Sequence, residues 1–176
     1  WYMVFKGIQG VTPTAGSLQD SWEGETAEND GVSAARTLTT SPSSHYKNGV
    51  SEIWSDDFTL IETVKYGMYA KGQEKAAVIF KASGTAKTAW FDKSKILYSD
   101  YEDLTTSSPQ FCSISGDGVR QFAVTDAHGV GCTSDYHWML VMDAGADSKP
   151  CGFDQDVTTR PYFLYSSGTT SVAPDL

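Results

Sequence analysis

The stretch FTLIETVKYGMYAKGQEKAAVIFKASG, residues 58–84, decides the fold class of this chain. Every second position from Val64 to Met68 carries a large apolar or aromatic side chain, whereas Lys65 between them is charged. Because the side chains of a strand alternate between two faces, this pattern predicts a β-strand. A second strand-like run, EKAAVIFKASG, follows across AKGQ, a connection of hairpin length. The stretch therefore predicts an antiparallel hairpin.

The same signals recur outward along the chain. Further strands are predicted in WYMVFKGIQG, AWF, KILY, QFCSISGDGVRQFAVTD, YHWMLVMD and RPYFLYSS. Together they give about nine or ten short strands, with Gly, Asp, Asn and Ser at the joints. Only SLQDSWEGE has helical character, with Ser17 as its cap. We expect an all-β fold, an antiparallel, jelly-roll-like β-sandwich with long loops and one short helix over residues 1–166. Residues 167–176 are expected to be a C-terminal tail or linker.

Composition excludes two classes of partner. The formal net charge is −9, and the 13 Lys and Arg residues are scattered singly. A protein that binds nucleic acid or an anionic membrane surface needs a basic face. No apolar run approaches the roughly 18 residues of a membrane-spanning helix. We therefore expect neither nucleic acid nor membrane as a partner. A first residue of Trp instead of Met favours a processed or truncated N-terminus, which is compatible with secretion.

A series of short motifs resembles a known family when taken in order. They are WYMVFKG, DSWEG, HYKNGVSEIW, AAVIFKASG, AWFD, SDYEDL, FCSISGDGVRQF, GCTSDYHWMLVMD and PCGFD. This order resembles an uncharacterised, β-rich domain of secreted matrix-type proteins from molluscs, cnidarians and lancelets. The resemblance implies an extracellular module and no particular activity. The chain departs from the pattern in lacking a Cys before His45 and in having Cys112 where an aromatic or small residue is expected.

Three cysteines allow at most one internal disulfide. Cys132 and Cys151 flank the predicted strand YHWMLVMD and the turn after it. One interpretation is a structural disulfide, which would stabilise the fold by about 3 kcal/mol in an oxidising compartment; the other is a reactive thiol pair. Cys112 is expected to be a small buried apolar residue, with a nucleophile or intermolecular linker as the alternative.

Acidic loops raise the question of calcium. Ca²⁺ takes six to eight oxygen ligands, often from carboxylates in loops. The loop carboxylates that could supply such ligands are Asp56, Asp57, Asp117 and Asp135. Solvated loops and turn formation explain most such residues, and no EF-hand spacing occurs. Calcium is therefore the alternative cofactor prediction, and otherwise we expect none.

The aromatic residues, five Trp, nine Tyr and eight Phe, divide by context. Aromatic rings in polar loops can stack on a sugar or anchor a protein contact, with Asp135 available to bond sugar hydroxyls. The candidates for such contacts are Trp22, Tyr46, Trp54 and Tyr136. Local packing is the competing interpretation for each of them. The residues within apolar runs are expected in the core: Trp1, Phe80, Trp90, Trp138 and Phe163.

No combination of residues specifies catalysis. His45, His128 and His137 lack an evident third ligand or activated partner. Paired acids such as Asp56–Asp57 or Glu102–Asp103 are adjacent, so on a strand their carboxylates point to opposite faces. Glycosidases need two carboxyl groups that face each other. The chain is therefore expected not to be an enzyme.

We expect a secreted, structural or adhesive module that mediates assembly with other protein chains or with copies of itself. The terminal strands WYMVFKG and PYFLYSS are the expected contact edges, because open strand edges can pair between chains. The alternative is a lectin that binds glycans, assisted by calcium.

Overall fold

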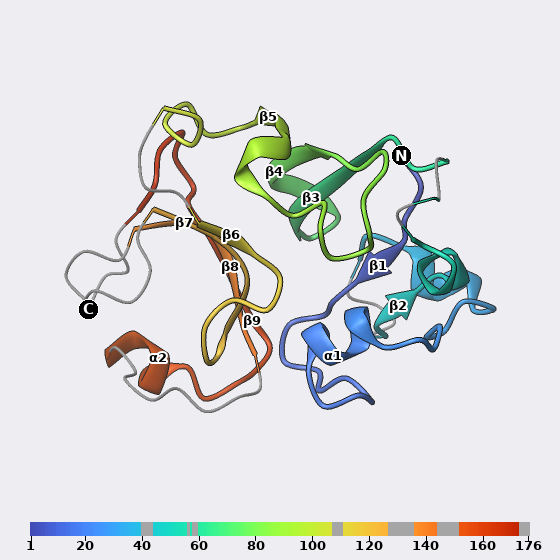
Figure 1. Cartoon of the computed structure of the whole chain (residues 1–176). Helices are drawn as coiled ribbons and strands as arrows, with labels where there is room; N and C mark the ends of the chain where they lie inside the picture. Colours follow the sequence, from blue (N-terminus) through green and yellow to red (C-terminus); the bar gives the residue numbers. More distant parts are fainter. Residues whose placement is uncertain are drawn as a thin grey trace.

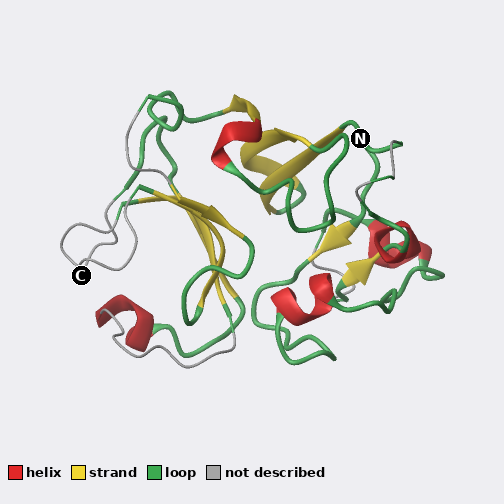
Figure 2. Cartoon of the chain, viewed as in Figure 1, coloured by secondary structure: helices red, strands yellow, loops and turns green. Residues whose placement is uncertain are grey.

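The computed structural model describes residues 1–39, 44–55, 57, 60–106, 111–126, 136–143 and 152–172, with only the backbone at positions 152 and 153. In this part of the chain, nine strands form three antiparallel sheets and both α-helices are short, which confirms the all-β prediction (Figure 2). None of the helices described is long and apolar enough to cross a membrane. In chain order the elements are β1 (Phe5–Lys6), α1 (Leu18–Glu23), the 3₁₀ helix η1 (Ser33–Arg36), β2 (Tyr46–Lys47), the 3₁₀ helix η2 (Gly49–Glu52), β3 (Thr63–Ala70), β4 (Gln73–Lys81), the 3₁₀ helix η3 (Lys93–Lys95), β5 (Ile96–Ser99), β6 (Phe111–Ser113), β7 (Arg120–Thr125), β8 (His137–Met142), α2 (Gly152–Asp156) and β9 (Tyr162–Tyr165).

The predicted hairpin forms β3 and β4, and β5 completes this three-stranded sheet (Figure 1). Its turn is Lys71-Gly72, and Ala70 pairs with Gln73 across it. Both turn residues have positive φ, 53° and 76°. A two-residue type I′ turn requires this backbone, because its twist matches that of the flanking strands. The hairpin prediction is confirmed down to the position of its turn.

The four-stranded sheet has the order β6-β7-β8-β9, so β8 is a central strand. The predicted hairpin around SGDG is confirmed as β6 and β7. Because His137 and Trp138 are neighbours on a strand, alternation predicts that one of them faces solvent. This prediction is wrong, since they are 3% and 0% exposed. The reason is that both faces of β8 are covered. Met139 and Val141 belong to the main core, whereas Leu140 and Met142, on the opposite face, pack in a second cluster with Ala123.

Strand order is the finer detail that local sequence did not specify. Neighbours within both larger sheets follow the order of the chain, which is a meander. A jelly roll instead pairs strands by Greek-key connections. The predicted strand WYMVFKGIQG is reduced to β1, and AWF is a turn whose Trp90 and Phe91 are buried. The short helix is confirmed as α1, where the Ser17 side chain accepts a hydrogen bond from the Asp20 amide.

An aromatic cluster occupies the centre of the main core. Trp22, Trp54 and Trp90 lie with ring centroids 5.8–6.2 Å apart. The core predictions for Phe80, Trp90 and Trp138 are confirmed, and Phe163 is half-buried against the same core. The prediction for Trp1 is wrong because 74% of this residue is exposed.

The segment after β9, expected as the start of a tail or linker, instead bonds back to the domain. His137 and Val172 exchange two backbone hydrogen bonds of 2.9 Å. The Glu102 amide donates to the Thr169 carbonyl at 2.7 Å, and the Ser171 amide donates to the Asp103 carboxylate at 3.0 Å. Residues 167–172 are therefore anchored beside β8, whereas 173–176 lie outside the described residues.

Candidate functional site

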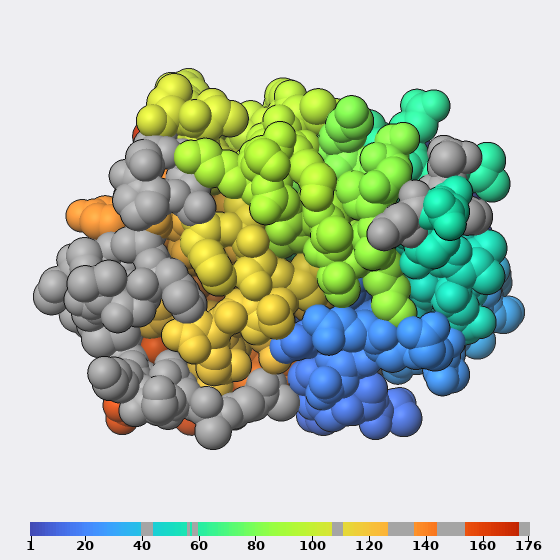
Figure 3. Space-filling model, viewed as in Figure 1, coloured from blue at the N-terminus to red at the C-terminus, as the bar shows by residue number. Residues whose placement is uncertain are grey.

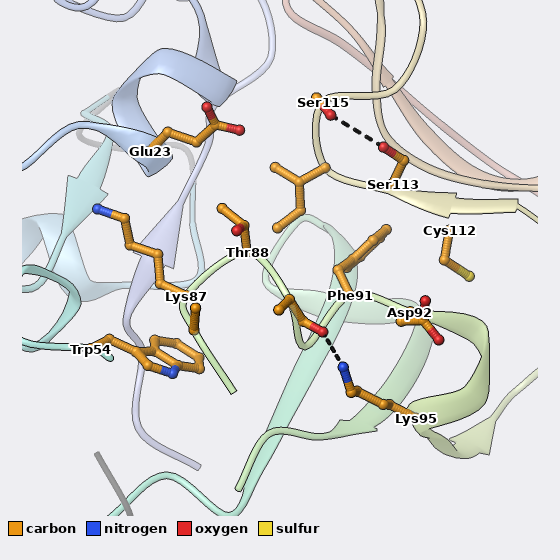
Figure 4. Close-up of a pocket in the computed structure, with 13 residues that line it drawn as sticks. Glu23, Trp54, Lys87, Thr88, Phe91, Asp92, Lys95, Cys112, Ser113 and Ser115 are labelled. Atoms are coloured by element: carbon orange, nitrogen blue, oxygen red, sulfur yellow. Dashed lines mark hydrogen bonds between the residues drawn. The ribbon is translucent and has the colours of Figure 1, made fainter. Parts of the chain in front are cut away.

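Two clefts flank the tryptophan cluster, and Trp54 lines both. The first, called the polar cleft, has a volume of about 700 Å³. It lies where the end of α1, the loop 86–92 and β6 meet, and Figure 3 shows the face on which these segments come together. Figure 4 shows the side chains that surround it: Glu23, Trp54, Lys87, Thr88, Phe91, Asp92, Lys95, Cys112, Ser113 and Ser115.

Hydrogen bonds to backbone hold the loop of the polar cleft in place. The Lys87 carbonyl accepts from the indole nitrogens of Trp22 at 3.0 Å and of Trp90 at 2.6 Å. The Lys87 ammonium donates to the Gly24 carbonyl at 3.0 Å, near the end of α1. Asp92 accepts from the Ser94 hydroxyl and amide, and these bonds lower the pKa of its carboxyl group. The cleft therefore presents fixed polar groups over an aromatic floor.

Cys112 borders the polar cleft and packs against the main core. Burial raises the pKa of its thiol to about 12. The group is therefore a neutral thiol at physiological pH, and a neutral thiol is a poor nucleophile. This placement supports the interpretation of Cys112 as a small apolar residue.

The second cleft, called the apolar cleft, has a volume of about 1290 Å³. It lies between the N-terminal segment 1–9, β3 and the β8–β9 face of the larger sheet. Its inner wall is mostly aromatic, and includes Phe5, Trp22, Tyr66, Phe122 and Phe163.

The polar atoms of this wall are already bonded. The Tyr66 hydroxyl donates to the Phe122 carbonyl at 3.0 Å, and the Trp22 indole donates to the Lys87 carbonyl. Burial raises the pKa of Tyr66 well above its usual value, so the phenol stays neutral. The inner wall therefore offers an apolar surface to whatever enters the cleft.

The rim of the apolar cleft combines exposed apolar residues with cations. Trp1, Tyr2, Leu38 and Leu60 are all exposed at the rim. Lys6, Arg36 and Lys65 supply the positive charges, and Glu62 supplies a carboxylate. The Lys65 ammonium bonds Glu74 and lies 5.5 Å from the centroid of the Trp1 ring. The rim is thus amphipathic, in contrast to the wall.

Three of the four aromatic contact candidates are buried, which corrects the expectation of exposed rings. Trp22, Tyr46 and Trp54 are 3%, 0% and 6% exposed. Their polar atoms are satisfied internally: the Trp54 indole donates to the Thr85 carbonyl, and the Tyr46 hydroxyl donates to Asp30, both at 2.8 Å. A ring with its polar atom bonded can be buried completely. Tyr136, the fourth candidate, is 40% exposed.

The predicted calcium ligands are only partly described. Asp57 and Asp117 are exposed, whereas Asp56 and Asp135 lie outside the described residues. Within the part of the chain that the structure describes, no group of three or more His, Cys, Asp or Glu residues could hold a metal ion. Cys132 and Cys151 also lie outside it, so their disulfide stays a prediction.

His45 has a structural role. Its Nδ1 accepts from the Ile8 amide at 3.2 Å, and its Nε2 lies 2.8 Å from the Val11 carbonyl. A ring that accepts at Nδ1 and donates at Nε2 is neutral. His45 therefore ties the N-terminal segment to β2.

Sequence reasoning missed two buried cations. Lys47 is fully buried in β2, and its ammonium donates to the carbonyls of Ser21, at 2.8 Å, and Gly24. Arg120 in β7 is buried and forms a two-point ion pair with Asp154 of α2, at 3.0 and 2.7 Å. Their only sequence signal was an isolated cation beside an aromatic or apolar residue, Tyr46 for Lys47 and Val119 for Arg120. Both link elements that are far apart in the chain.

Comparison with models of protein families, with curated proteins and with solved structures finds no match to this chain.

Proposed function

We propose that this chain is an extracellular, non-enzymatic module that assembles with other protein chains or with its own copies through the edges of the β3-β4-β5 sheet. The proposal depends mainly on the exposed residues of β5. This short strand lies at the edge of its sheet, and it exposes two adjacent large residues, Leu97 at 58% and Tyr98 at 53%.

Edge strands present backbone groups that another strand can pair with, and soluble proteins commonly protect them with charges or covering loops. Leu97 and Tyr98 are instead apolar or aromatic and exposed. At the other edge, β3 lies beside the exposed Trp1 and Leu60 at the rim of the apolar cleft. Because the two exposed edges differ, contact between the β5 edge of one copy and the β3 edge of the next would give head-to-tail assembly.

The test is size-exclusion chromatography with light scattering over a range of protein concentrations. We expect the native chain to form concentration-dependent oligomers, and Leu97→Lys with Tyr98→Lys to shift it towards monomer. The matched control is Ile53→Lys, since Ile53 is 63% exposed but lies outside any strand. A native chain that is monomeric throughout, or equal effects of both sets of substitutions, would contradict assembly through β5.

The polar cleft supports the second candidate, a carbohydrate-binding lectin. Carboxylates and hydroxyls surround it, and a sugar needs such partners. A glycan array with and without EDTA tests both sugar binding and the proposed help of calcium. We expect saturable binding that Glu23→Gln weakens, because Glu23 lines the cleft. No glycan bound in either condition would reject this candidate and leave the assembly proposal intact.

A further inference from the structure

We propose that the apolar cleft binds an amphipathic anion, a long-chain carboxylate, with its hydrocarbon chain against the aromatic wall and its head group at Lys6. This site goes beyond the proposed assembly: it borders the β3 edge, whereas Leu97 and Tyr98 of β5, which carry the assembly proposal, do not line it. The proposal rests on the size of the cleft, the character of its wall and the placement of one cation at its rim.

The volume of the cleft is far larger than that of an ordinary packing void. Protein interiors are close-packed, with few voids larger than a water molecule, whereas this cleft measures about 1290 Å³. Small-molecule sites typically span about 300–1000 Å³, with mainly apolar walls and few polar groups. The cleft is therefore large enough for a long hydrocarbon chain.

The wall selects an apolar body for the ligand. Phe5 packs on Trp22 and Phe122, with ring centroids 5.5 and 6.1 Å apart, and forms a continuous aromatic surface. The donors of Trp22 and Tyr66 are committed to backbone carbonyls. A sugar or peptide backbone would lose its hydrogen bonds to water here and find few replacements.

The position of the head group follows from a comparison of the three cations at the rim. Lys65 bonds Glu74, and Arg36 lies 3.8 Å from the Asp30 carboxylate. Lys6 forms no ion pair with any described carboxylate, and its ammonium donates to the Thr37 carbonyl at 3.2 Å. Partial burial of this ammonium lowers its pKa, and a carboxylate partner would restore the lost solvation. Charge complementarity therefore favours an anion beside Lys6.

The first experiment titrates dodecanoate into the chain by calorimetry and by tryptophan fluorescence, since Trp22, Trp54 and Trp90 line the cleft. We expect saturable binding of one dodecanoate per chain. Octanoate should bind at least tenfold more weakly, because it buries four fewer methylene groups. Dodecylammonium should also bind at least tenfold more weakly. This comparison is stringent because non-specific attraction to a chain of net charge −9 would favour the cation.

The second experiment tests the head-group partner. Lys6→Met should weaken dodecanoate binding about tenfold, the effect of losing one charge-assisted hydrogen bond. The matched control is Lys75→Met, which removes an exposed cation of β4 and should leave binding unchanged. Val64→Trp should abolish binding by filling the cleft, with its fold checked by circular dichroism. If that variant does not fold, the two lysine variants decide.

The proposal would be overturned by the absence of saturable dodecanoate binding, by equal affinity for dodecylammonium, or by equal effects of Lys6→Met and Lys75→Met. Strong binding of octanoate together with weak binding of dodecanoate would likewise exclude the apolar wall as the site of the chain.

Discussion

At the scale of single residues, the surroundings of a side chain decide its chemistry. Cys112 shows this most directly. Alone in water its thiol would ionise near pH 9, but burial against the main core raises its pKa to about 12. The nearby charges act in opposite directions, since Asp92 raises this pKa and Lys93 lowers it. Desolvation is the larger effect, so the thiol stays protonated at physiological pH in the folded chain.

Thiol labelling checks this prediction. At pH 8 the native chain and Cys112→Ser should react with a disulfide reagent at the same rate and to the same extent. In urea the native sequence should label one thiol more than the variant, because unfolding returns Cys112 to water. The subtraction isolates Cys112 whatever the state of Cys132 and Cys151. A faster reaction of the native sequence before unfolding would show that Cys112 is accessible and ionised.

The predictions for single residues were correct where the decisive hydrogen bond is local, and wrong where it comes from a distant part of the chain. Polar neighbours in the sequence placed Trp22 and Trp54 among the exposed candidates, yet both are buried. Burial depends on whether a distant carbonyl reaches the indole nitrogen, and the carbonyls of Lys87 and Thr85 do so. Ser17 was predictable, in contrast, because its bond to the Asp20 amide is local.

At the scale of elements, short pieces are held by long-range polar links. Helix α2 has five residues, too few to be stable alone. Its Asp154 is 1% exposed and forms the two-point ion pair with Arg120 of β7. Arg160 adds a bond of 2.8 Å from its guanidinium to the Asp154 carbonyl. The helix therefore depends on β7 for its position.

Removing one partner of this pair should be strongly destabilising. Asp154→Ala removes the carboxylate that bonds the buried Arg120 guanidinium at two points, and the loss of one member of a buried ion pair costs about 3–5 kcal/mol. Urea unfolding followed by circular dichroism measures the change. The control is Asp156→Ala, an exposed acid of the same helix, for which we expect a change within about 0.5 kcal/mol. If both variants lost similar amounts of stability, the cause would be a change in the helix itself and not the loss of the ion pair.

At the scale of the whole molecule, hydrogen-bonded carboxylates link stability to pH. Asp30 accepts from the Tyr46 hydroxyl and from the Gly49 amide, and these bonds lower its pKa below the usual 3.8. Hydrogen bonds from Lys65 and Tyr69 lower the pKa of Glu74 in the same way. Because the folded-state values lie below the unfolded ones, the folded state gains stability above the unfolded pKa values. It loses that gain as the pH falls through the folded values.

We therefore expect the urea concentration at the unfolding midpoint to decrease when the pH is lowered below about 4, because these carboxylates become protonated. Asp30→Asn should have a lower urea midpoint than the native chain at pH 7. The gap between the two midpoints should be smaller at pH 3, because the advantage of the charged carboxylate is lost as the pH falls below the unfolded pKa of 3.8. Urea titrations at the two pH values measure the gap. A gap of equal size at both would show that the charge of Asp30 does not contribute.

The sequence by itself determined the all-β class, the β3–β4 hairpin with its turn, the β6–β7 hairpin, β8, β9 and the cap of α1, because each depends on alternation or bonding between near neighbours. Only the tertiary structure decided the meander order, the burial of His137 on a doubly covered strand, and the ion pair of Arg120. It also decided the apolar cleft, whose wall and rim bring the N-terminal segment 1–9 against β3 and β9. These features join residues that are distant in the chain, and local periodicity does not specify which distant surfaces meet.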